Sequence, residues 1–211
     1  MDVKINAPDI LKNEILKKEK GSVFISSLTD PYQPLERKYE LTRRCLEILL
    51  GHQFPVIIQT KSSLVLRDMD LLKKFKDCEV GLTITLLDDD VRKKFEPLAS
   101  SISERFETLS VLNNEGIRTY VFFGPILPYL SDINIDGLFE KIKELKIDHI
   151  FVDKLNLKSN TWQNIRIILE KNYPEMIEKW QSALYEPEYY RNLKTKIKSI
   201  LSNRIRYNFC F

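Results

Sequence analysis

Two loops of this sequence carry side chains suited to holding a small charged ligand. In the first loop, Thr29 and Asp30 are followed by Pro31 and Pro34, which stiffen the backbone by fixing φ. The hydroxyl and the carboxylate could bind an ammonium group or a ribose hydroxyl. The same side chains could instead accept hydrogen bonds from free N–H groups at the start of the next helix, and the loop would then be an ordinary capped turn.

Lys61 lies in the second loop, between Thr60 and Ser62. An ammonium group beside hydroxyls is suited to binding a carboxylate or a phosphate. Further along the chain, Thr83 and Thr85 alternate with apolar residues, so a strand would place both hydroxyls on one face. Because threonine also favours strands, hydroxyls that merely line a barrel interior explain this pair equally well.

Residues that could ligate a metal ion are scattered. The three cysteines, Cys45, Cys78 and Cys210, are too far apart in sequence for a disulfide framework or a compact metal loop. The two histidines, His52 and His149, lack the spacing of about three to five residues that paired zinc ligands need. The sequence therefore predicts no metal site built from the residues of this chain.

Strands and helices that alternate along the chain must position the two loops. Short apolar runs rich in β-branched and aromatic residues predict buried strands at 23–27, 55–60, 80–86, 118–123 and 148–153. The charged stretches between them have apolar residues at helical spacing and predict amphipathic helices. Repeated strand–helix units form a parallel sheet, open or closed into a barrel, that binds ligands at the carboxyl ends of its strands. Asp30 and Lys61 are predicted to lie at that edge.

The alternation stops after residue 158. Later segments predict helices at 162–171, 174–182 and 188–202 and a short edge strand at 206–210. At the other end, residues 1–20 predict a helix that precedes every strand. We therefore expect a barrel of five strand–helix units over 1–158, lacking its first strand, and a helical extension over 159–211.

Composition narrows the class of protein. The 211 residues are 43% hydrophobic and 30% charged, which suffices for a core and is unlike a disordered chain. No apolar run approaches the roughly 20 residues of a membrane span, and the start does not resemble a signal peptide. We expect a soluble cytoplasmic protein with no membrane partner.

The net charge of +3 gives no indication of a polyanion partner for the whole chain. From position 191 to the end, however, basic residues occur without any acidic one. This segment could bind nucleic-acid phosphates, or it could be a solvated helix face. Its cations are Arg191, Lys194, Lys196, Lys198, Arg204 and Arg206.

Seven motifs occur in an order that resembles one family. They are Thr-Asp-Pro-Tyr-Gln-Pro with Glu36, Thr-Lys-Ser, Gly-Leu-Thr-Ile-Thr, Phe-Glu-Pro-Leu-Ala-Ser with Arg105, Gly-Ile-Arg-Thr-Tyr-Val, Gly-Pro-Ile-Leu-Pro and Lys-Leu-Asn-Leu-Lys. In this order they resemble the radical S-adenosylmethionine family related to spore photoproduct lyase, often labelled DNA-repair photolyases. The resemblance runs from Val3 to the closing Tyr-Asn-Phe-Cys-Phe.

The resemblance implies a partial (β/α)₆ barrel of the TIM type whose strand ends hold S-adenosylmethionine. Thr29 and Asp30 would lie near the methionyl end of the cofactor, and Lys61 would pair with its carboxylate. Thr83 would contact the ribose, and Arg105 is a second candidate for the carboxylate.

The family also implies a 4Fe–4S cluster held by a CxxxCxxC loop that precedes the residue matching Val3. This sequence has no such motif, and its three cysteines, which fall in separate elements, cannot replace it. We therefore expect the chain as written to be a truncated or decayed relative that is inactive in radical chemistry.

Two other functions stay open. The chain could be a binding protein that uses the barrel rim for S-adenosylmethionine, a nucleotide or a nucleic acid without redox chemistry. An aldolase-type barrel would use Lys61 or Lys154 as a Schiff-base lysine, which requires a desolvated amine. The ordered resemblance accounts for both lysines without that chemistry.

Overall fold

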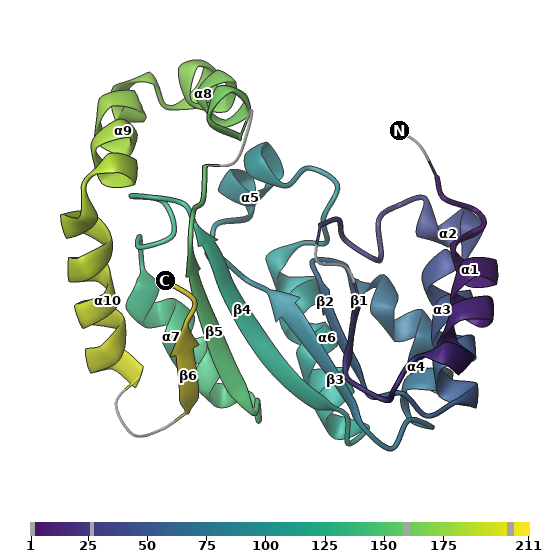
Figure 1. Cartoon of the computed structure of the whole chain (residues 1–211). Helices are drawn as coiled ribbons and strands as arrows, with labels where there is room; N and C mark the ends of the chain where they lie inside the picture. Colours follow the sequence, from purple (N-terminus) through teal and green to yellow (C-terminus); the bar gives the residue numbers. More distant parts are fainter. Residues whose placement is uncertain (1–2, 26–27, 158–160, 202–204) are drawn as a thin grey trace. The chain divides into compact units, whose positions relative to one another are not determined.

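Within the described part of the chain, six strands form one sheet, seen in a computed structural model (Figure 1). The structure describes residues 3–25, 28–157, 161–201 and 205–211. The strands follow the order β1-β2-β3-β4-β5-β6, and the pairs β1–β2, β2–β3 and β5–β6 are parallel. They are β1 (Val23–Ile25), β2 (Val56–Thr60), β3 (Cys78–Thr83), β4 (Arg118–Ile126), β5 (His149–Lys154) and β6 (Arg206–Phe209).

Helices separate the strands along the chain. α1 (Ala7–Glu14) and η1 (Ile15–Lys17) precede β1. Before β5 come α2 (Glu36–Tyr39), α3 (Leu41–Gly51), η2 (Ser63–Asp68), α4 (Met69–Leu72), α5 (Asp89–Phe95), α6 (Ile102–Asn114) and α7 (Ile135–Glu144). After β5 come α8 (Thr161–Asn172), η3 (Pro174–Met176), α9 (Ile177–Tyr185) and α10 (Pro187–Leu201). Alternating strands and helices around one sheet give the partial TIM-type barrel that the sequence predicts.

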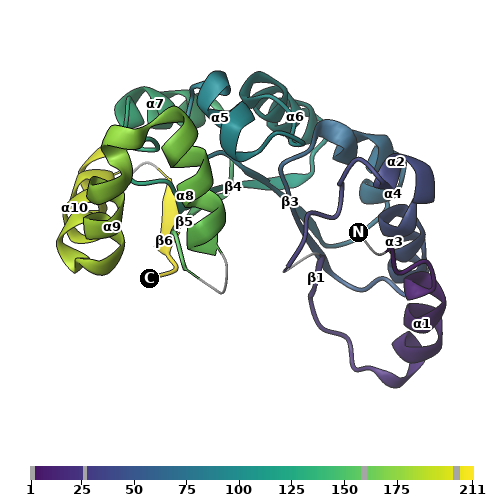
Figure 2. The same ribbon diagram turned by 90° about the horizontal axis from the view of Figure 1, so that it is seen from above.

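The chain forms two compact units. Unit one comprises Met1–Leu82 and Leu98–Tyr120, and unit two comprises Thr83–Pro97 and Val121–Phe211. The predicted boundary near residue 158 stays a prediction. In unit one, α1 lies beside α3 (Figures 1 and 2). The turn η2 contacts α6. In unit two, α9 contacts α10 and α8, and α10 also contacts α7.

Each unit buries its own apolar side chains. In unit one the fully buried residues include Leu46 and Leu49 of α3, Ile58 of β2, and Leu109 of α6. A core side chain of this size stabilises the fold by about 1.5–3 kcal/mol when it is fully buried. In unit two the rings of Phe123 and Phe139 meet edge to face at 5.3 Å, and Phe95 stacks on Trp180 at 5.9 Å.

Local signals account for several element ends. Ser101 begins α6 with a capping box, in which its hydroxyl accepts from the Glu104 N–H while Glu104 accepts from the Ser101 N–H. Gly116 has φ of 78° just after α6, where only glycine is free of strain. Three consecutive aspartates, Asp88 to Asp90, stand at the start of α5. The Asp88 carboxylate accepts from the N–H groups of Asp90 and Val91 and so caps the helix.

The predicted helical part after residue 158 is confirmed, and so is the short strand, β6, which pairs with β5 through His149 and Arg206. The predicted helix at 174–182 begins as the 3-10 turn η3, and residue 202 of the predicted helix at 188–202 lies outside the described residues. The predicted third strand is wrong at its end, because β3 stops at Thr83 while the Ile84 N–H donates to the Phe122 carbonyl. Residues 26 and 27 of the predicted first strand lie outside the described residues. None of the described helices is long and apolar enough to cross a membrane.

Candidate functional site

The loop after β1 is tied to the end of β2 by Asp30. Its Oδ1 accepts from the Tyr32 N–H at 2.8 Å and from the Thr60 hydroxyl at 2.6 Å, and its Oδ2 accepts from the Lys61 N–H at 2.7 Å. A carboxylate offers about four acceptor positions, so three are used inside the protein. The Asp30 side chain thus fastens two strand-end loops together, a role that the sequence reasoning missed.

The backbone of Lys61 is held from both sides. Its N–H donates to Asp30, and its carbonyl accepts from the Ser100 N–H at 3.0 Å. Ser100 also bonds to the residue two positions after Lys61, since its hydroxyl accepts from the Ser63 N–H at 2.9 Å. Because both backbone groups are hydrogen-bonded, the surrounding loops fix the point at the carboxyl end of β2 from which the Lys61 side chain extends.

Arg105 is a buried residue that bonds to the backbone of Ser100. Its side chain has no exposed surface, and its Nε donates to the carbonyl of Ser100 at 3.0 Å. Asp30 therefore bonds directly to Lys61, and Lys61 and Arg105 are linked through Ser100. Direct contact between Arg105 and a cofactor carboxylate stays a prediction, because its guanidinium is buried against protein.

The two predicted threonines differ in their surroundings. Thr29 is exposed beside Asp30 and has no hydrogen-bond partner among the residues that the structure describes. Thr83 ends β3 in unit two and is only 2% exposed. Their assignments to the methionyl end and to the ribose stay predictions.

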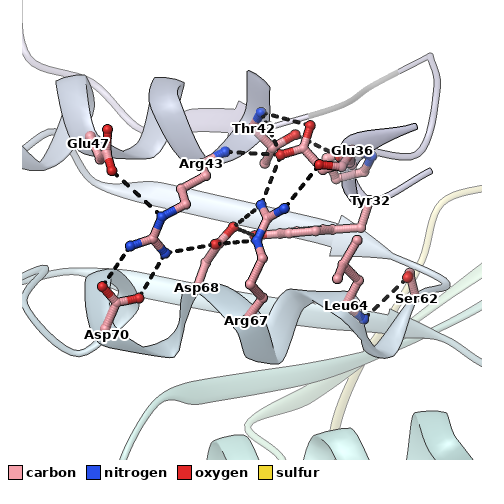
Figure 3. A network of polar contacts seen from close by, with 11 residues as sticks. Tyr32, Glu36, Thr42, Arg43, Glu47, Ser62, Leu64, Arg67, Asp68 and Asp70 are labelled. Atoms are coloured by element: carbon pink, nitrogen blue, oxygen red, sulfur yellow. Dashed lines mark hydrogen bonds and ion pairs between the residues drawn. The ribbon is translucent and has the colours of Figure 1, made fainter. Parts of the chain in front are cut away.

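A buried ion network fixes the other side of the first loop (Figure 3). The Asp68 side chain is 0% exposed and accepts from Tyr32 Oη at 3.0 Å, Arg43 Nη1 at 3.0 Å and Arg67 Nε at 2.8 Å. Glu36 accepts from Arg67 Nη2 at 2.9 Å. Its two carboxylate oxygens also accept from the Thr42 N–H in the first turn of α3.

Burial and charge shift the pKa values of this network. Desolvation, followed by the nearby Asp68 carboxylate, raises the pKa of Tyr32 well above its ordinary value, so the phenol stays a hydrogen-bond donor. The acceptor carboxylates raise the pKa values of the Arg43 and Arg67 guanidinium groups. The two guanidinium groups therefore stay charged, and the network positions the loop.

Sequence reasoning missed this network. Arg67 and Asp68 are adjacent, yet Glu36 is 31 residues away from Arg67, and Tyr32 is 36 residues away from Asp68. Charged residues in amphipathic stretches are usually solvent-facing, and periodicity cannot show which of them pair across elements. In the sequence, Glu36 stands out only as part of the motif that follows the first strand.

The thiols do not form a cluster site. Cys45 lies within α3, Cys78 begins β3 at its amino end, and Cys210 follows β6 in unit two. Burial raises the pKa of Cys78 to about 12 and also raises the pKa of Cys45, whereas a metal ligand must be a thiolate. No group of three His, Cys, Asp or Glu side chains in the described part of the chain could hold a metal ion. The thiols present therefore do not fit an iron–sulfur cluster.

The basic segment at the end of the chain is divided between different surroundings. Lys194 Nζ donates to the Phe211 backbone oxygen at 2.7 Å, and Lys196 pairs with Asp136 at 3.3 Å. Lys198 is exposed. Arg204 lies outside the described residues. The segment is therefore not a uniform face of equivalent cations.

Comparisons with known proteins support the fold. No family model matches the sequence. An uncharacterised protein of Methanocaldococcus jannaschii is 40% identical over 176 residues, which cover 83% of this chain and 64% of that protein. The radical SAM Nα-GlyT isomerase of Pseudomonas phage M6 is 24% identical over 154 residues, which cover 72% of this chain and 32% of that protein. The chain thus spans less than two thirds of the length of these relatives.

Solved structures of two radical enzymes superpose on most of the chain. Spore photoproduct lyase complexed with dinucleoside spore photoproduct has a TM-score of 0.72 at 13% identity, over 96% of this chain and 67% of the lyase. Streptococcus suis SuiB bound to S-adenosylmethionine has a TM-score of 0.55 at 13% identity, over 96% of this chain and 42% of SuiB. The chain therefore has the fold of radical S-adenosylmethionine enzymes such as spore photoproduct lyase.

Proposed function

We propose that this chain binds S-adenosylmethionine at the strand-end loops of unit one, as a relative of the radical enzymes that resemble spore photoproduct lyase. The observation that carries the proposal is the fixation of Lys61, whose N–H and carbonyl are both bonded to neighbouring loops. A lysine held in this way at the carboxyl end of a parallel strand stands where such sheets bind ligands. The SuiB structure with bound S-adenosylmethionine supports the same cofactor here.

In this proposal each residue has a distinct task. The Lys61 ammonium pairs with the carboxylate of the methionyl group, while the Thr29 hydroxyl and the remaining acceptor position of Asp30 lie near the same end. Thr83 belongs to unit two, and its assignment to the ribose stays a prediction from the sequence. Arg105 holds Ser100 and so helps to position Lys61, and its guanidinium is the second proposed partner of the carboxylate.

Reductive cleavage of the bound cofactor would require an iron–sulfur cluster, and the thiols of this chain do not fit one. We therefore assign the described residues to binding and propose no radical step for them. Whether the 211-residue chain is a truncated enzyme or a non-redox binding protein, its own side chains would perform the same task.

Calorimetry with S-adenosylmethionine tests the proposal. Lys61→Ala should remove about 1–3 kcal/mol of binding free energy, the range for a charge-assisted hydrogen bond. Lys76→Ala is the matched control, because Lys76 is exposed just before the amino end of β3 and away from the carboxyl ends of the strands. Equal affinity of the wild type and the Lys61 variant, or no binding by either, would reject the assignment.

A further inference from the structure

An acidic pocket lies in unit two between the loop that follows β4 and the helices α9 and α10. Its volume of about 470 Å³ falls within the roughly 300–1,000 Å³ of small-molecule sites. Three carboxylates line it: Asp132 of the loop, Glu186 between the two helices, and Glu188 in the first turn of α10. Lys196 is the one cation among the described residues that line this pocket.

The protein does not neutralise the three carboxylates of the acidic pocket. None of them has a lysine, arginine or histidine within ion-pair distance among the residues that the structure describes. Lys196 pairs at 3.3 Å with Asp136 of α7, which is outside the lining, so the lysine charge is already compensated. The carboxyl end of α9 and the amino end of α10 are adjacent in the chain, and their opposite partial charges largely cancel. The pocket therefore carries net negative charge.

Asp132 offers the pocket a hydrogen-bond acceptor that none of the described residues uses. Its Oδ1 is shielded from solvent and has no donor partner within the described ranges. Such oxygens are nearly always hydrogen-bonded in proteins, because desolvation without a partner is costly. A positively charged N–H group would satisfy this oxygen and compensate its charge at the same time. The oxygen thus points to a cation that donates hydrogen bonds.

Two tyrosine rings stand beside this carboxylate. The rings of Tyr129 and Tyr189 are tilted by 51° with their centres 4.9 Å apart, and the Tyr189 hydroxyl accepts from the Tyr129 N–H at 3.1 Å. Tyr189 also meets the ring of Tyr190 edge to face at 5.1 Å. Burial raises the pKa of Tyr189, and the Asp132 carboxylate adds to the rise, so the phenol stays neutral. Neutral ring faces of this kind attract ammonium groups.

The carboxylates are spread along the pocket. No group of three His, Cys, Asp or Glu side chains in the part of the chain that the structure describes could share one metal ion. A single divalent ion would therefore contact two of the three carboxylates at most, whereas ammonium groups joined by methylene groups can reach all of them. Ala183 and Leu193 are buried residues of the lining, and their apolar side chains would cover the methylene groups.

From these observations we propose that the acidic pocket binds a linear polyamine. One ammonium group donates to Asp132 Oδ1 beside the Tyr129 ring, and the others pair with Glu186 and Glu188. This proposal goes beyond the binding of S-adenosylmethionine and does not depend on it. Polyamine binding is measured without that cofactor, so either proposal can fail by itself.

Isothermal titration calorimetry of the full chain with spermidine tests the proposal at about 0.15 M ionic strength, where diffuse attraction is largely screened. Asp132→Asn should weaken binding by about tenfold, as expected for a lost charge-assisted hydrogen bond. Glu186→Gln and Glu188→Gln should each weaken it about two- to fivefold, because ion pairs of exposed residues contribute less. Glu178→Gln is the matched control, since it removes the same charge from α9 at an exposed residue outside the lining. Thermal melting checks that each variant folds.

Competing ligands test which features of the polyamine are recognised. n-Butylamine has one ammonium group and should displace spermidine at least about tenfold less effectively, because it can pair with one carboxylate only. Mg²⁺ should also compete poorly, because it requires oxygen ligands that converge on one point.

Several results would overturn the proposal. If Glu178→Gln weakens binding as much as Glu188→Gln, or if Mg²⁺ competes as well as spermidine, the attraction is a general effect of negative charge. If an acetylated and amidated trilysine peptide, which has as many ammonium groups, binds more tightly than spermidine, the pocket takes basic side chains of a protein. Absence of binding by the wild-type chain, or unchanged binding by a folded Asp132→Asn variant, would also reject the site. If that variant does not fold, the comparison of Glu186→Gln and Glu188→Gln with Glu178→Gln decides.

Discussion

Asp68 is the residue on which the polar network of unit one depends, because two arginines and a tyrosine donate to its fully buried carboxylate. Asp68→Asn keeps the volume and removes the charge that compensates Arg43 and Arg67. Breaking a buried ion pair by neutralising one partner costs about 3–5 kcal/mol. We expect the free energy of unfolding, measured by urea denaturation, to fall by about this amount.

Asp70→Asn is the control for Asp68→Asn, because it removes another carboxylate charge that pairs with Arg43. Asp70 accepts two hydrogen bonds from Arg43 at 2.8 Å, yet its side chain is 53% exposed. Hydrogen bonding to Arg43 lowers the pKa of Asp70 to about 2. Since this lies below the ordinary value, its contribution is present above that value and is lost as the pH falls toward 2. Asp70→Asn should therefore cost less than Asp68→Asn and flatten the acid limb of the stability curve. Equal losses at neutral pH would contradict the assigned roles.

At the scale of elements, Gly81 lets β3 pass the Tyr120 ring of β4 within unit one. A Cβ atom at position 81 would overlap three atoms of that ring, which is itself only 1% exposed. Gly81→Ala should therefore lower the free energy of unfolding by about 1–3 kcal/mol, the usual cost of overpacking. Denaturation of Gly51→Ala is the comparison, because nothing lies within 4 Å of its added Cβ at the end of α3. If the two variants are equally stable, the strands can move apart at low cost.

The elements were largely predictable from sequence, and the contacts between them were not. Runs such as 55–60 and 148–153 predict β2 and β5 within about a residue, because buried strands require consecutive apolar side chains. The same reasoning places Asp30 and Lys61 at strand ends. It could not assign the Asp30 carboxylate to Thr60 and the Lys61 N–H, since those bonds join loops 30 residues apart in the chain.

Tertiary contacts also decide where an element ends. The alternation around Thr83 and Thr85 predicts a strand to residue 86, yet β3 stops at Thr83. The next N–H bonds to Phe122, a partner that no local pattern reveals. The acidic pocket depends likewise on Asp132, Glu186 and Tyr189, which come from the loop after β4, the junction of α9 and α10, and α10.

At the scale of the whole chain, the positions of the cysteines bear on our proposal that the described residues bind the cofactor and carry out no redox step. An iron–sulfur cluster needs several thiolates at one place, whereas Cys45, Cys78 and Cys210 belong to α3, to the start of β3 and to the segment after β6. The 211-residue polypeptide, reconstituted anaerobically with iron and sulfide, should therefore show no absorbance shoulder near about 400 nm. Iron analysis and a Cys45→Ala, Cys210→Ala double variant serve as controls, because the spectrum of that variant should match the wild type. A stoichiometric four-iron cluster on the wild-type polypeptide that this double variant loses would mean that these thiols do converge, and the chain would then hold the redox centre itself.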